Sequence, residues 1–290
     1  MPLNKELAEI LQNELICQHI AETTEGSRKK DILVVVRNQL DYVKKCLEAV
    51  RENTSDYNLH VWNNASDEET TAWLDEFGNT LPVEAGWCID HVPENQGFIT
   101  PNNEMAACCK SDYIVLLNSD TEVRKGWDTA MIGWLEQNPK YGVVGYEGGL
   151  VAHNGVGVGV GHGNDVDYIA GWCLCISRNL YKSLGLFDEN NLKFAYGEDL
   201  DFCLRAREAG LRSYALHLKY VLHHGNRTTN TVRHEMDLKS SFNANHKYIR
   251  ERWKGFLESK RTLLRFPQLE KEAREKLGEC PMIEASSNQG

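Results

Sequence analysis

Short apolar runs alternate with amphipathic segments along this chain, and this alternation constrains the fold more than any other feature. The apolar runs Asp31–Val36, His60–Trp62, Cys88–Val92 and Tyr113–Leu117 all have the length of β-strands. Segments with helical periodicity separate them, as at Asp41–Arg51. Strands that alternate with helices at this spacing predict a parallel sheet with helices on both faces. The predicted fold class is therefore α/β.

The length of the chain favours one main domain with helical additions. At 290 residues and 41% hydrophobic content the chain can bury a full core. Residues 1–30 predict an N-terminal helix and linker, residues 31–230 the main domain, and residues 231–290 a C-terminal helical extension with a polar tail. Residues 155–163 are rich in glycine but lack the spacing of a dinucleotide-binding motif. We expect them to form an extended segment or mobile loop.

Charge and hydropathy exclude several classes of protein. The net charge of −10 argues against nucleic-acid binding that depends mainly on neutralising phosphates. No apolar stretch approaches the ~18 residues needed to span a bilayer, and the N-terminus does not resemble a signal peptide. We therefore expect a cytoplasmic protein. The nine cysteines lack paired zinc-site spacing, which favours buried free thiols.

Two acidic motifs are candidates for the functional site. The run Tyr113–Leu117 ends in Asn118–Thr121, and open α/β sheets bind ligands just beyond the carboxyl ends of their strands. Further along, Glu198–Asp201 begins an amphipathic helical pattern that ends at Gly210. Asp120 is therefore a candidate metal ligand, and the acidic cluster is a candidate base. Together they indicate metal-dependent transfer of a group from a donor that carries a diphosphate.

Five motifs follow one another in a fixed order along residues ~31–230. They are Glu94–Phe98 with Asn102 and Asn103; Leu117–Thr121; Gly171 with Phe187 and Asp188; Glu198–Asp201 with Arg205; and His223–Gly225. No single motif is specific, but in this order they resemble the family 2 inverting glycosyltransferases of the GT-A fold, and most of all the rhamnosyltransferase-like branch. The resemblance implies a hexosyl- or deoxyhexosyltransferase that moves a sugar from a nucleoside diphosphate sugar to the hydroxyl of a saccharide or another acceptor.

The resemblance also implies a divalent cation, Mn²⁺ or Mg²⁺, held by Asp120 and His223. Such a cation stabilises the charge that develops on the leaving diphosphate. Asn118 takes the place of the first aspartate of the commoner Asp-x-Asp motif, which removes one charge. His223 and His224 both follow a predicted strand; we favour His223 as the ligand and keep His224 as a candidate substrate contact.

In the resembled family the base that takes the acceptor proton corresponds to Asp199, with Glu198 beside it as a second catalytic candidate. The amides of a helix N-terminus lower the pKa of a carboxyl, whereas neighbouring carboxylates raise it, and the sequence leaves the balance open. Asp201 is expected to pair with Arg205 one helical turn on, and it is also a candidate substrate contact. The others are Gly171 and Trp172, the latter either facing the acceptor sugar or lying in the core.

Nucleotide recognition is expected on the loops that follow the first strands. The resembled family usually has Asp after the second strand, where it accepts the imide proton of uracil or thymine; this chain has Asn63, which keeps a carbonyl acceptor and adds a donor. Asn38 and Asn95 would contact the base or ribose, and Gly97 would let the backbone approach the nucleotide. With Asn118 and Asp120, these residues form the candidate site for a UDP- or dTDP-sugar.

Two other classes of protein remain open. A nucleotidyltransferase that makes activated sugars would also use a metal-binding aspartate, but it should carry a glycine-rich phosphate loop where this chain has Arg37–Gln39. A non-catalytic sugar-binding protein on a degenerate transferase fold is suggested by Asn63 and Asn118. Slow, Mn²⁺- or Mg²⁺-dependent hydrolysis of a nucleoside diphosphate sugar would argue against both.

Overall fold

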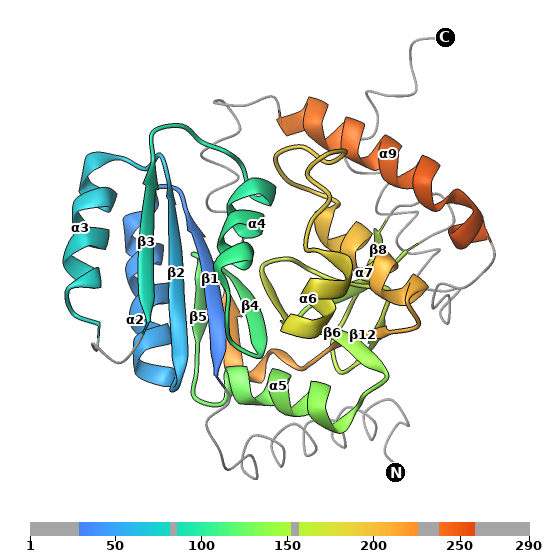
Figure 1. Ribbon diagram of the computed structural model, residues 1–290, viewed down its shortest axis with the longest axis horizontal. Coiled ribbons are helices and arrows are strands. Elements are labelled where there is room, and N and C mark those ends of the chain that lie inside the picture. The colour runs from blue at the N-terminus through green and yellow to red at the C-terminus, as the bar shows by residue number, and fades with distance from the viewer. Residues whose placement is uncertain (1–28, 82–85, 152–156, 226–237, 259–290) are drawn as a thin grey trace, which may run out of the picture.

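The structure is a computed structural model that describes residues 29–81, 86–151, 157–225 and 238–258 (Figure 1). Its elements in chain order are β1 (Lys30–Val36), α2 (Leu40–Asn53), β2 (Tyr57–Asn64), α3 (Glu68–Gly78), β3 (Trp87–Val92), α4 (Ile99–Cys108), β4 (Tyr113–Asn118), β5 (Thr121–Val123), α5 (Trp127–Gln137), β6 (Tyr141–Gly145), β7 (Gly148–Val151), β8 (Gly157–Gly161), β9 (Asn164–Val166), β10 (Tyr168–Ile169), β11 (Cys173–Ser177), α6 (Arg178–Leu184), α7 (Glu198–Glu208), β12 (Arg212–Ala215), the short 3₁₀ helix η1 (Leu218–Tyr220), β13 (Val221–His223) and α9 (Leu238–Glu258). The predicted N-terminal helix and the polar C-terminal tail lie outside the described residues.

An eight-stranded mixed sheet organises the chain, with the strand order β3-β2-β1-β4-β11-β6-β12-β9. β1 pairs in parallel with β2 and β4, β2 with β3, and β6 with β12. β11 runs antiparallel between β4 and β6, and β9 is an antiparallel edge strand. The predicted α/β class with a mostly parallel sheet is confirmed.

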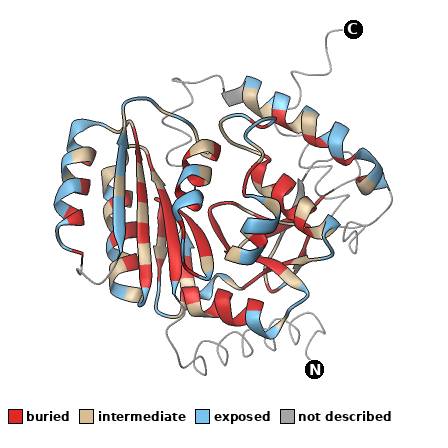
Figure 2. Cartoon of the chain, viewed as in Figure 1, coloured by how far each residue is buried: buried red, intermediate tan, exposed pale blue. Residues whose placement is uncertain are grey.

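Helices cover both faces of the sheet because the strands present apolar side chains to both. On β1, Ile32 and Val34 belong to the core that α2, α3 and α5 complete, whereas Leu33 belongs to the core formed with α4, α6, α7 and α9. Figure 2 shows buried residues along the central strands and on the helix sides that face them. Ile249 and Trp253 of α9 lie in the second core, so this C-terminal helix packs directly on the sheet domain.

The carboxyl ends of β1, β2 and β4 meet at one edge of the sheet because these strands are parallel. The short antiparallel pair of β5 and β13 lies beside this edge and brings His223 opposite Thr121, the residue after Asp120. The backbone amide of His224 also donates to the carbonyl of Asp120 at 3.0 Å. The predicted aspartate and histidine motifs, far apart in sequence, therefore lie side by side.

The glycine-rich segment is more regular than predicted. Residues 157–161 form β8, which pairs antiparallel with β7, while residues 152–156 lie outside the described part of the chain. Glycine permits a close approach between strands here, because a Cβ on Gly148 would lie 2.3 Å from the carbonyl oxygen of Tyr168.

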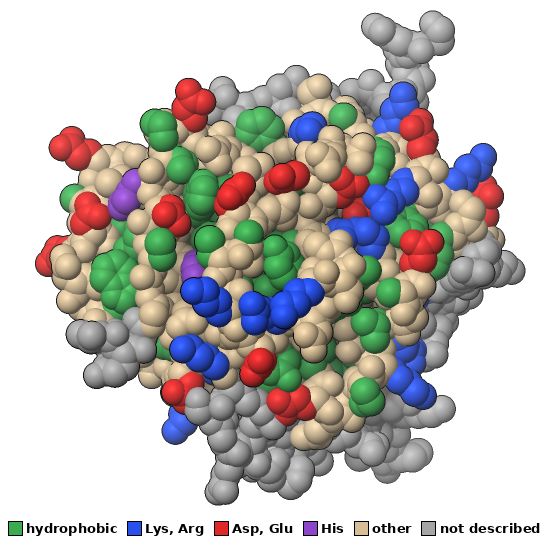
Figure 3. Space-filling model, viewed as in Figure 1, with side chains coloured by type: hydrophobic (Ala, Val, Ile, Leu, Met, Phe, Trp, Pro, Cys, Tyr) green, Lys and Arg blue, Asp and Glu red, His purple; other side chains and the backbone are tan. Residues whose placement is uncertain are grey.

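The surface carries charges of both signs. Figure 3 shows acidic and basic side chains interspersed over the visible face, and the short row of basic side chains near its middle is flanked by acidic ones. Within the described ranges, no helix combines the length and the apolar character that a membrane span requires.

Candidate active site

Asp120 and His223 face each other at the carboxyl edge of the sheet. The distance from Asp120 Oδ1 to His223 Nε2 is 3.2 Å, and the Asp120 residue is only 5% exposed. The Nε2 atom is buried, and no described residue forms a hydrogen bond with it. A buried imidazole nitrogen that points at a carboxylate without forming a hydrogen bond suits two ligands that share one cation.

Trp172 fixes the orientation of the His223 ring. The two rings stack with their centroids 4.4 Å apart at an interplanar angle of 11°. The Trp172 carbonyl also accepts a hydrogen bond of 2.8 Å from the backbone amide of Asn118, so it ties this segment to the end of β4. Trp172 is 6% exposed and belongs to the core, and its indole supports the histidine. Its contact with the acceptor sugar stays a prediction.

The second histidine of the motif points to a different partner. His224 Nε2 lies 2.7 Å from Glu122 Oε1, and its ring is 5.0 Å from that of Tyr42. Of the two histidines it is therefore His223 that lies beside Asp120. The contact of His224 with substrate stays a prediction.

Glu198 and Asp199 begin α7 directly after Gly197, whose φ of 90° is left-handed. Asp199 Oδ2 accepts a hydrogen bond of 3.0 Å from the backbone amide of Gly171, and Oδ1 accepts one of 2.7 Å from the amide of Leu200. Gly171 therefore contacts the candidate base Asp199, and its contact with substrate stays a prediction. A Cβ at this position would lie 3.6 Å from the Cβ of Asp199, in ordinary contact.

The structure resolves the competing influences on the pKa of the acidic pair. Burial raises the pKa of Asp199 above its usual range, although the amides of Gly171 and Leu200 act in the opposite direction. Burial and the adjacent charge of Asp199 raise the pKa of Glu198 well above its usual range. Glu198 Oε2 is buried and has no hydrogen-bond partner among the described residues. A carboxyl with a raised pKa is a stronger base, which suits proton abstraction near neutral pH.

Replacing Glu198 with glutamine should increase the thermal stability of the protein at neutral pH. Because the pKa of Glu198 is higher in the folded than in the unfolded protein, its protonated carboxyl adds to the free energy of unfolding. This contribution is complete below the unfolded-state pKa of ~4.3 and is lost as the pH rises through the folded-state pKa. A glutamine side chain does not ionise, so the variant does not lose stability in this way. The midpoint of unfolding of the variant should therefore exceed that of the wild type increasingly from pH 4 to pH 8, by about 2–4 °C for each kcal/mol gained.

Thermal unfolding followed by circular dichroism across this pH range measures the difference. Glu208→Gln is the matched control, because Glu208 is exposed at the other end of α7. A difference between Glu198→Gln and wild type that stays constant with pH would contradict a raised pKa.

Asp201 has structural partners on two helices, and its contact with substrate stays a prediction. The residue is fully buried, with Oδ2 2.8 Å from Arg205 Nε and Oδ1 2.8 Å from Trp253 Nε1. The ion pair with Arg205 one helical turn on is confirmed. Arg205 further donates to the carbonyls of Leu184 and Leu186. Asp201 therefore joins α7 to α9.

The loops at the ends of β1 and β2 are held by their own asparagines. The backbone amide of Asn38 donates to Ser66 Oγ at 2.9 Å, and Asn38 Oδ1 accepts from the amide of Asp67 at 2.8 Å. Asn63 is 2% exposed; its Nδ2 lies 2.9 Å from Thr71 Oγ1 and 2.8 Å from His91 Nδ1. Its Oδ1, the predicted acceptor for the base, accepts a hydrogen bond of 3.2 Å from the amide of Ser66. Recognition of the base by Asn63 stays a prediction.

Asn64, which the sequence reasoning did not single out, anchors the loop that carries Asn95 and Gly97. Its Nδ2 donates to Asn95 Oδ1 at 2.9 Å and to the Gly97 carbonyl at 2.8 Å, and its Oδ1 accepts from the amide of Gln96 at 2.8 Å. The residue is 3% exposed. Two consecutive asparagines at the end of a strand were the available signal, since adjacent residues of a strand point to opposite faces.

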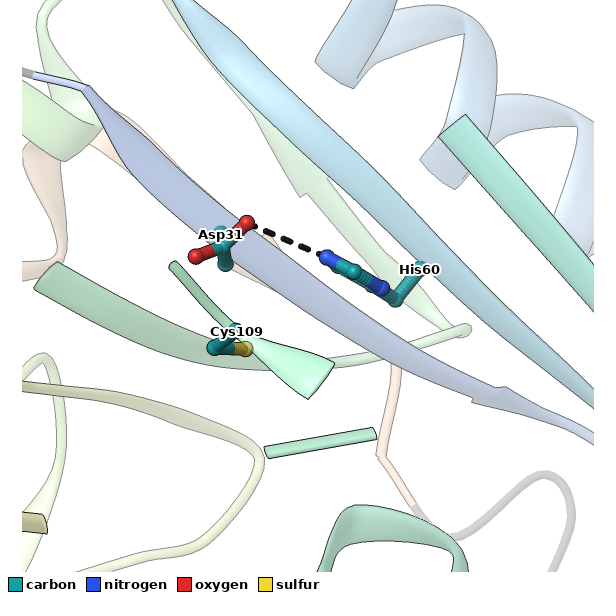
Figure 4. A group of neighbouring side chains, drawn as sticks. All are labelled: Asp31, His60 and Cys109. Atoms are coloured by element: carbon teal, nitrogen blue, oxygen red, sulfur yellow. Dashed lines mark hydrogen bonds and ion pairs between the residues drawn. The ribbon is translucent and has the colours of Figure 1, made fainter. Parts of the chain in front are cut away.

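A second group of side chains that could bind a metal lies at the opposite end of the strands, near the start of β1. Figure 4 shows Asp31 at the start of β1 beside His60 of β2 and Cys109. Both oxygens of Asp31 are engaged: Oδ1 accepts from Asn58 at 2.6 Å, and Oδ2 from the amide of Ser111 at 2.7 Å.

These side chains form a structural network. The Cys109 thiol donates to the Met105 carbonyl at 3.4 Å. Burial acts to raise the pKa of Asp31, but hydrogen bonds from His60, Asn58 and Ser111 outweigh it and hold the pKa well below its usual range. The network therefore joins β1, β2 and the end of α4 without needing a cation. Five of the seven cysteines in the described segments are buried, as expected, while Cys88 and Cys108 are exposed.

Solved glycosyltransferases share the arrangement of the mixed sheet and its helices, which is the GT-A fold. Residues 31–149 match the family model described as Glycosyl transferase family 2. A mannosyltransferase from Pyrobaculum calidifontis, solved with GDP-Man and Mn²⁺, has a TM-score of 0.58 at 15% identity over 98% of this chain and 85% of its own. GalNAc-T7, solved with UDP, GalNAc and Mn²⁺, has a TM-score of 0.63 at 14% identity over 87% of this chain and 55% of its own.

Curated relatives point to the same class. The Pre-mycofactocin glycosyltransferase of Mycobacterium tuberculosis is 23% identical over 233 residues, which are 72% of this chain and 46% of that protein. The chain thus spans about half the length of this relative. The chain is thus similar to the Glycosyl transferase family 2 model over residues 31–149, and it shares its fold with the solved glycosyltransferases. The rhamnosyltransferase-like branch stays a prediction.

Proposed function

We propose that this protein is a metal-dependent inverting glycosyltransferase that moves a sugar from a nucleoside diphosphate sugar to an acceptor hydroxyl. The observation that carries the proposal is the pair of Asp120 and His223, 3.2 Å apart, with a buried His223 Nε2 that has no hydrogen-bond partner in the described residues. The family match over residues 31–149 and the GT-A neighbours support transfer of a sugar over the transfer of a nucleotide.

The donor atoms of this pair fit a divalent cation. The carboxylate oxygen suits both Mn²⁺ and Mg²⁺. The imidazole nitrogen favours Mn²⁺ over Mg²⁺, because Mg²⁺ prefers oxygen ligands. Asp120 and His223 would hold the ion, and Trp172 fixes the plane of the imidazole. When bound, such a cation stabilises the negative charge on the departing nucleoside diphosphate. Two of the structural neighbours were solved with Mn²⁺.

Asp199 is the proposed base. Inversion requires that the acceptor oxygen attacks the anomeric carbon from the face opposite the diphosphate while a carboxylate removes the hydroxyl proton. The amides of Gly171 and Leu200 hold both oxygens of Asp199 in place, and burial raises its pKa. Glu198, with its higher pKa, shares the proton equilibrium of the site because two adjacent buried carboxyls titrate as a pair.

The loops at the carboxyl ends of the strands are our candidate for the binding site of the donor nucleotide and its sugar. Asn38, Asn95, Gly97 and Asn118 line the loops and strand end at the carboxyl edge of the sheet, and we assign donor binding to them. A UDP- or dTDP-sugar remains our proposal. Two neighbours were solved with GDP-Man and with UDP-GlcNAc. Asn63, at the end of β2, stays our candidate for contact with the base. A hexose or deoxyhexose fits the resemblance to the rhamnosyltransferase-like branch.

A thermal-shift screen of nucleoside diphosphates with and without Mn²⁺ tests this function. A ligand that binds only the folded protein raises its stability by about 2.7 kcal/mol at a concentration a hundred times its dissociation constant. We expect UDP or dTDP with Mn²⁺ to raise the unfolding midpoint, and Mn²⁺ or nucleotide alone to raise it much less. If no nucleoside diphosphate raises the midpoint in the presence of Mn²⁺ or Mg²⁺, the proposal is wrong.

A further inference from the structure

The five residues before the acidic pair, residues 193–197, form a strained loop. Phe194 and Tyr196 have φ angles of 62° and 76°, in the left-handed region that bulky side chains rarely adopt. Such a conformation persists only where the surrounding structure holds it in place, and it is found preferentially at functional sites. Glu198 and Asp199 follow this loop directly, so its conformation fixes where α7 begins.

Asn245 of α9 holds this loop from one side. The two N–H groups of its Nδ2 are shared among the carbonyls of Lys193, Ala195 and Tyr196 at 2.9–3.0 Å, and its Oδ1 accepts from the amide of Lys193 at 2.9 Å. Asn245 is fully buried, so water cannot replace these bonds. A single side chain therefore bonds the backbone of three of the five loop residues.

α9 also limits the position of Gly197 itself. A Cβ on Gly197 would lie 2.4 Å from Ile249 Cδ1, one helical turn after Asn245. The first turn of α7 is therefore in direct contact with α9.

The other side of the same loop contacts the candidate donor loop. The carbonyl of Phe194 accepts hydrogen bonds from the amides of Phe98 at 2.7 Å and Ile99 at 3.1 Å. Gly97 has a φ of 78°, and a Cβ there would lie 2.7 Å from the Phe194 oxygen. Asn64 holds Gly97 to the end of β2. The loop of residues 193–197 thus connects the candidate base with the candidate donor site.

We propose that Asn245 is a positioning residue that holds the carboxylates of Glu198 and Asp199 and the Gly97 loop in one shared arrangement. This inference rests on the proposed function and adds the C-terminal helix α9 to the parts that the reaction needs. Without the four hydrogen bonds, Phe194 and Tyr196 relax toward right-handed backbone angles. Asp199 then loses its register with the amide of Gly171, and the Phe194 carbonyl moves away from Phe98 and Ile99.

The variants Asn245→Ala and Asn245→Ser remove these bonds to different extents, and the milder serine variant guards against a failure to fold. Tyr248→Phe is the matched control. It removes the hydrogen bond of 2.8 Å that the Tyr248 hydroxyl donates to Asp188 and the one of 2.7 Å that it accepts from Arg252, and neither partner belongs to residues 193–197. All three variants are compared with the wild type well below their unfolding midpoints.

Hydrogen exchange provides a readout that does not depend on activity. In both Asn245 variants the amides of Phe98, Ile99 and Gly171 should exchange faster, because their acceptors are Phe194 and Asp199. The central strand β1 should be unchanged. In Tyr248→Phe these three amides should keep their wild-type protection.

Transfer kinetics provide the second readout. With Asn245 replaced we expect kcat to fall by about 10²-fold, as a misplacement of about 1 Å can cause, and the Michaelis constant for the donor to rise. The rising limb of the pH profile should shift to lower pH, because burial is what raises the pKa of Asp199. A purely structural role for Asn245 would lower the unfolding midpoint and leave the pH profile of the folded enzyme unchanged.

The outcomes separate this inference from the proposed function. Unchanged exchange at Phe98, Ile99 and Gly171 in folded Asn245 variants overturns the positioning role, as does a wild-type pH profile and kcat. A wild-type protein that transfers no sugar overturns the proposed function. Even in that case, faster exchange of the amides of Phe98, Ile99 and Gly171 in the Asn245 variants would support the role of Asn245 in holding the Gly97 loop and Asp199.

Discussion

Replacing Asp120 with alanine is expected to abolish metal-dependent sugar transfer while the protein stays folded. Lewis-acid stabilisation of the leaving diphosphate is worth several kcal/mol, so its loss should reduce kcat by roughly 10³-fold or more. His223→Ala should reduce the rate strongly but less, because the carboxylate carries the charge that attracts the cation. Initial rates at increasing Mn²⁺ concentrations measure both effects, and added Mn²⁺ should partly restore His223→Ala alone.

Glu122→Gln is the matched control for these variants. Glu122 lies two residues after Asp120 on β5, and its side chain pairs with His224 instead of His223. Removing its charge should change the rate little. Equal Mn²⁺ dependence of Asp120→Ala and wild type would show that the cation binds elsewhere, and the metal-site assignment would have to be abandoned.

Asp199→Asn should reduce transfer by roughly 10²- to 10⁴-fold, the range typical for the loss of a general base. The amide keeps the size and polarity of the side chain, so donor affinity measured by calorimetry should be nearly unchanged. In the wild type, kcat should rise with pH as the raised pKa of Asp199 is passed, because the base must be unprotonated. This rise should be lost in the variant.

Asp201→Asn separates the chemical role from the structural one. Asp201 lies in the same turn of α7 but bonds Arg205 and Trp253, so its replacement should lower the unfolding midpoint far more than kcat. Asp199→Asn with most of its transfer rate and normal donor affinity would mean that another group is the base. The anomeric configuration of the product, read by NMR, tests inversion; retention would rule out a single displacement.

The alternation of apolar and helical segments was sufficient to predict the α/β class and the edge of the sheet where the site lies. Buried parallel strands require apolar residues throughout, and their carboxyl ends must meet at one edge, so Asp120 could be placed from Tyr113–Leu117 alone. The ion pair of Asp201 with Arg205 also followed from sequence, because residues four apart share one face of a helix. These features depend on local spacing.

The tertiary structure decided the features that depend on long-range contacts. Only the register of β13 on β5 shows which histidine lies beside Asp120. Only burial decides between the two opposing influences on the pKa of Asp199.

The structure also assigned roles that a residue's own position in sequence does not reveal. Asn63 and Trp172 follow strand and loop patterns typical of ligand-binding residues, yet both are enclosed by neighbours from distant segments. Asn245 lies on the amphipathic helix α9, outside the five motifs. The sequence by itself determined which secondary structure forms and where its strands end, because periodicity and strand direction are local properties. The partners and the electrostatics of each site residue were decided by packing, since desolvation and hydrogen bonding depend on groups that only the folded chain brings together.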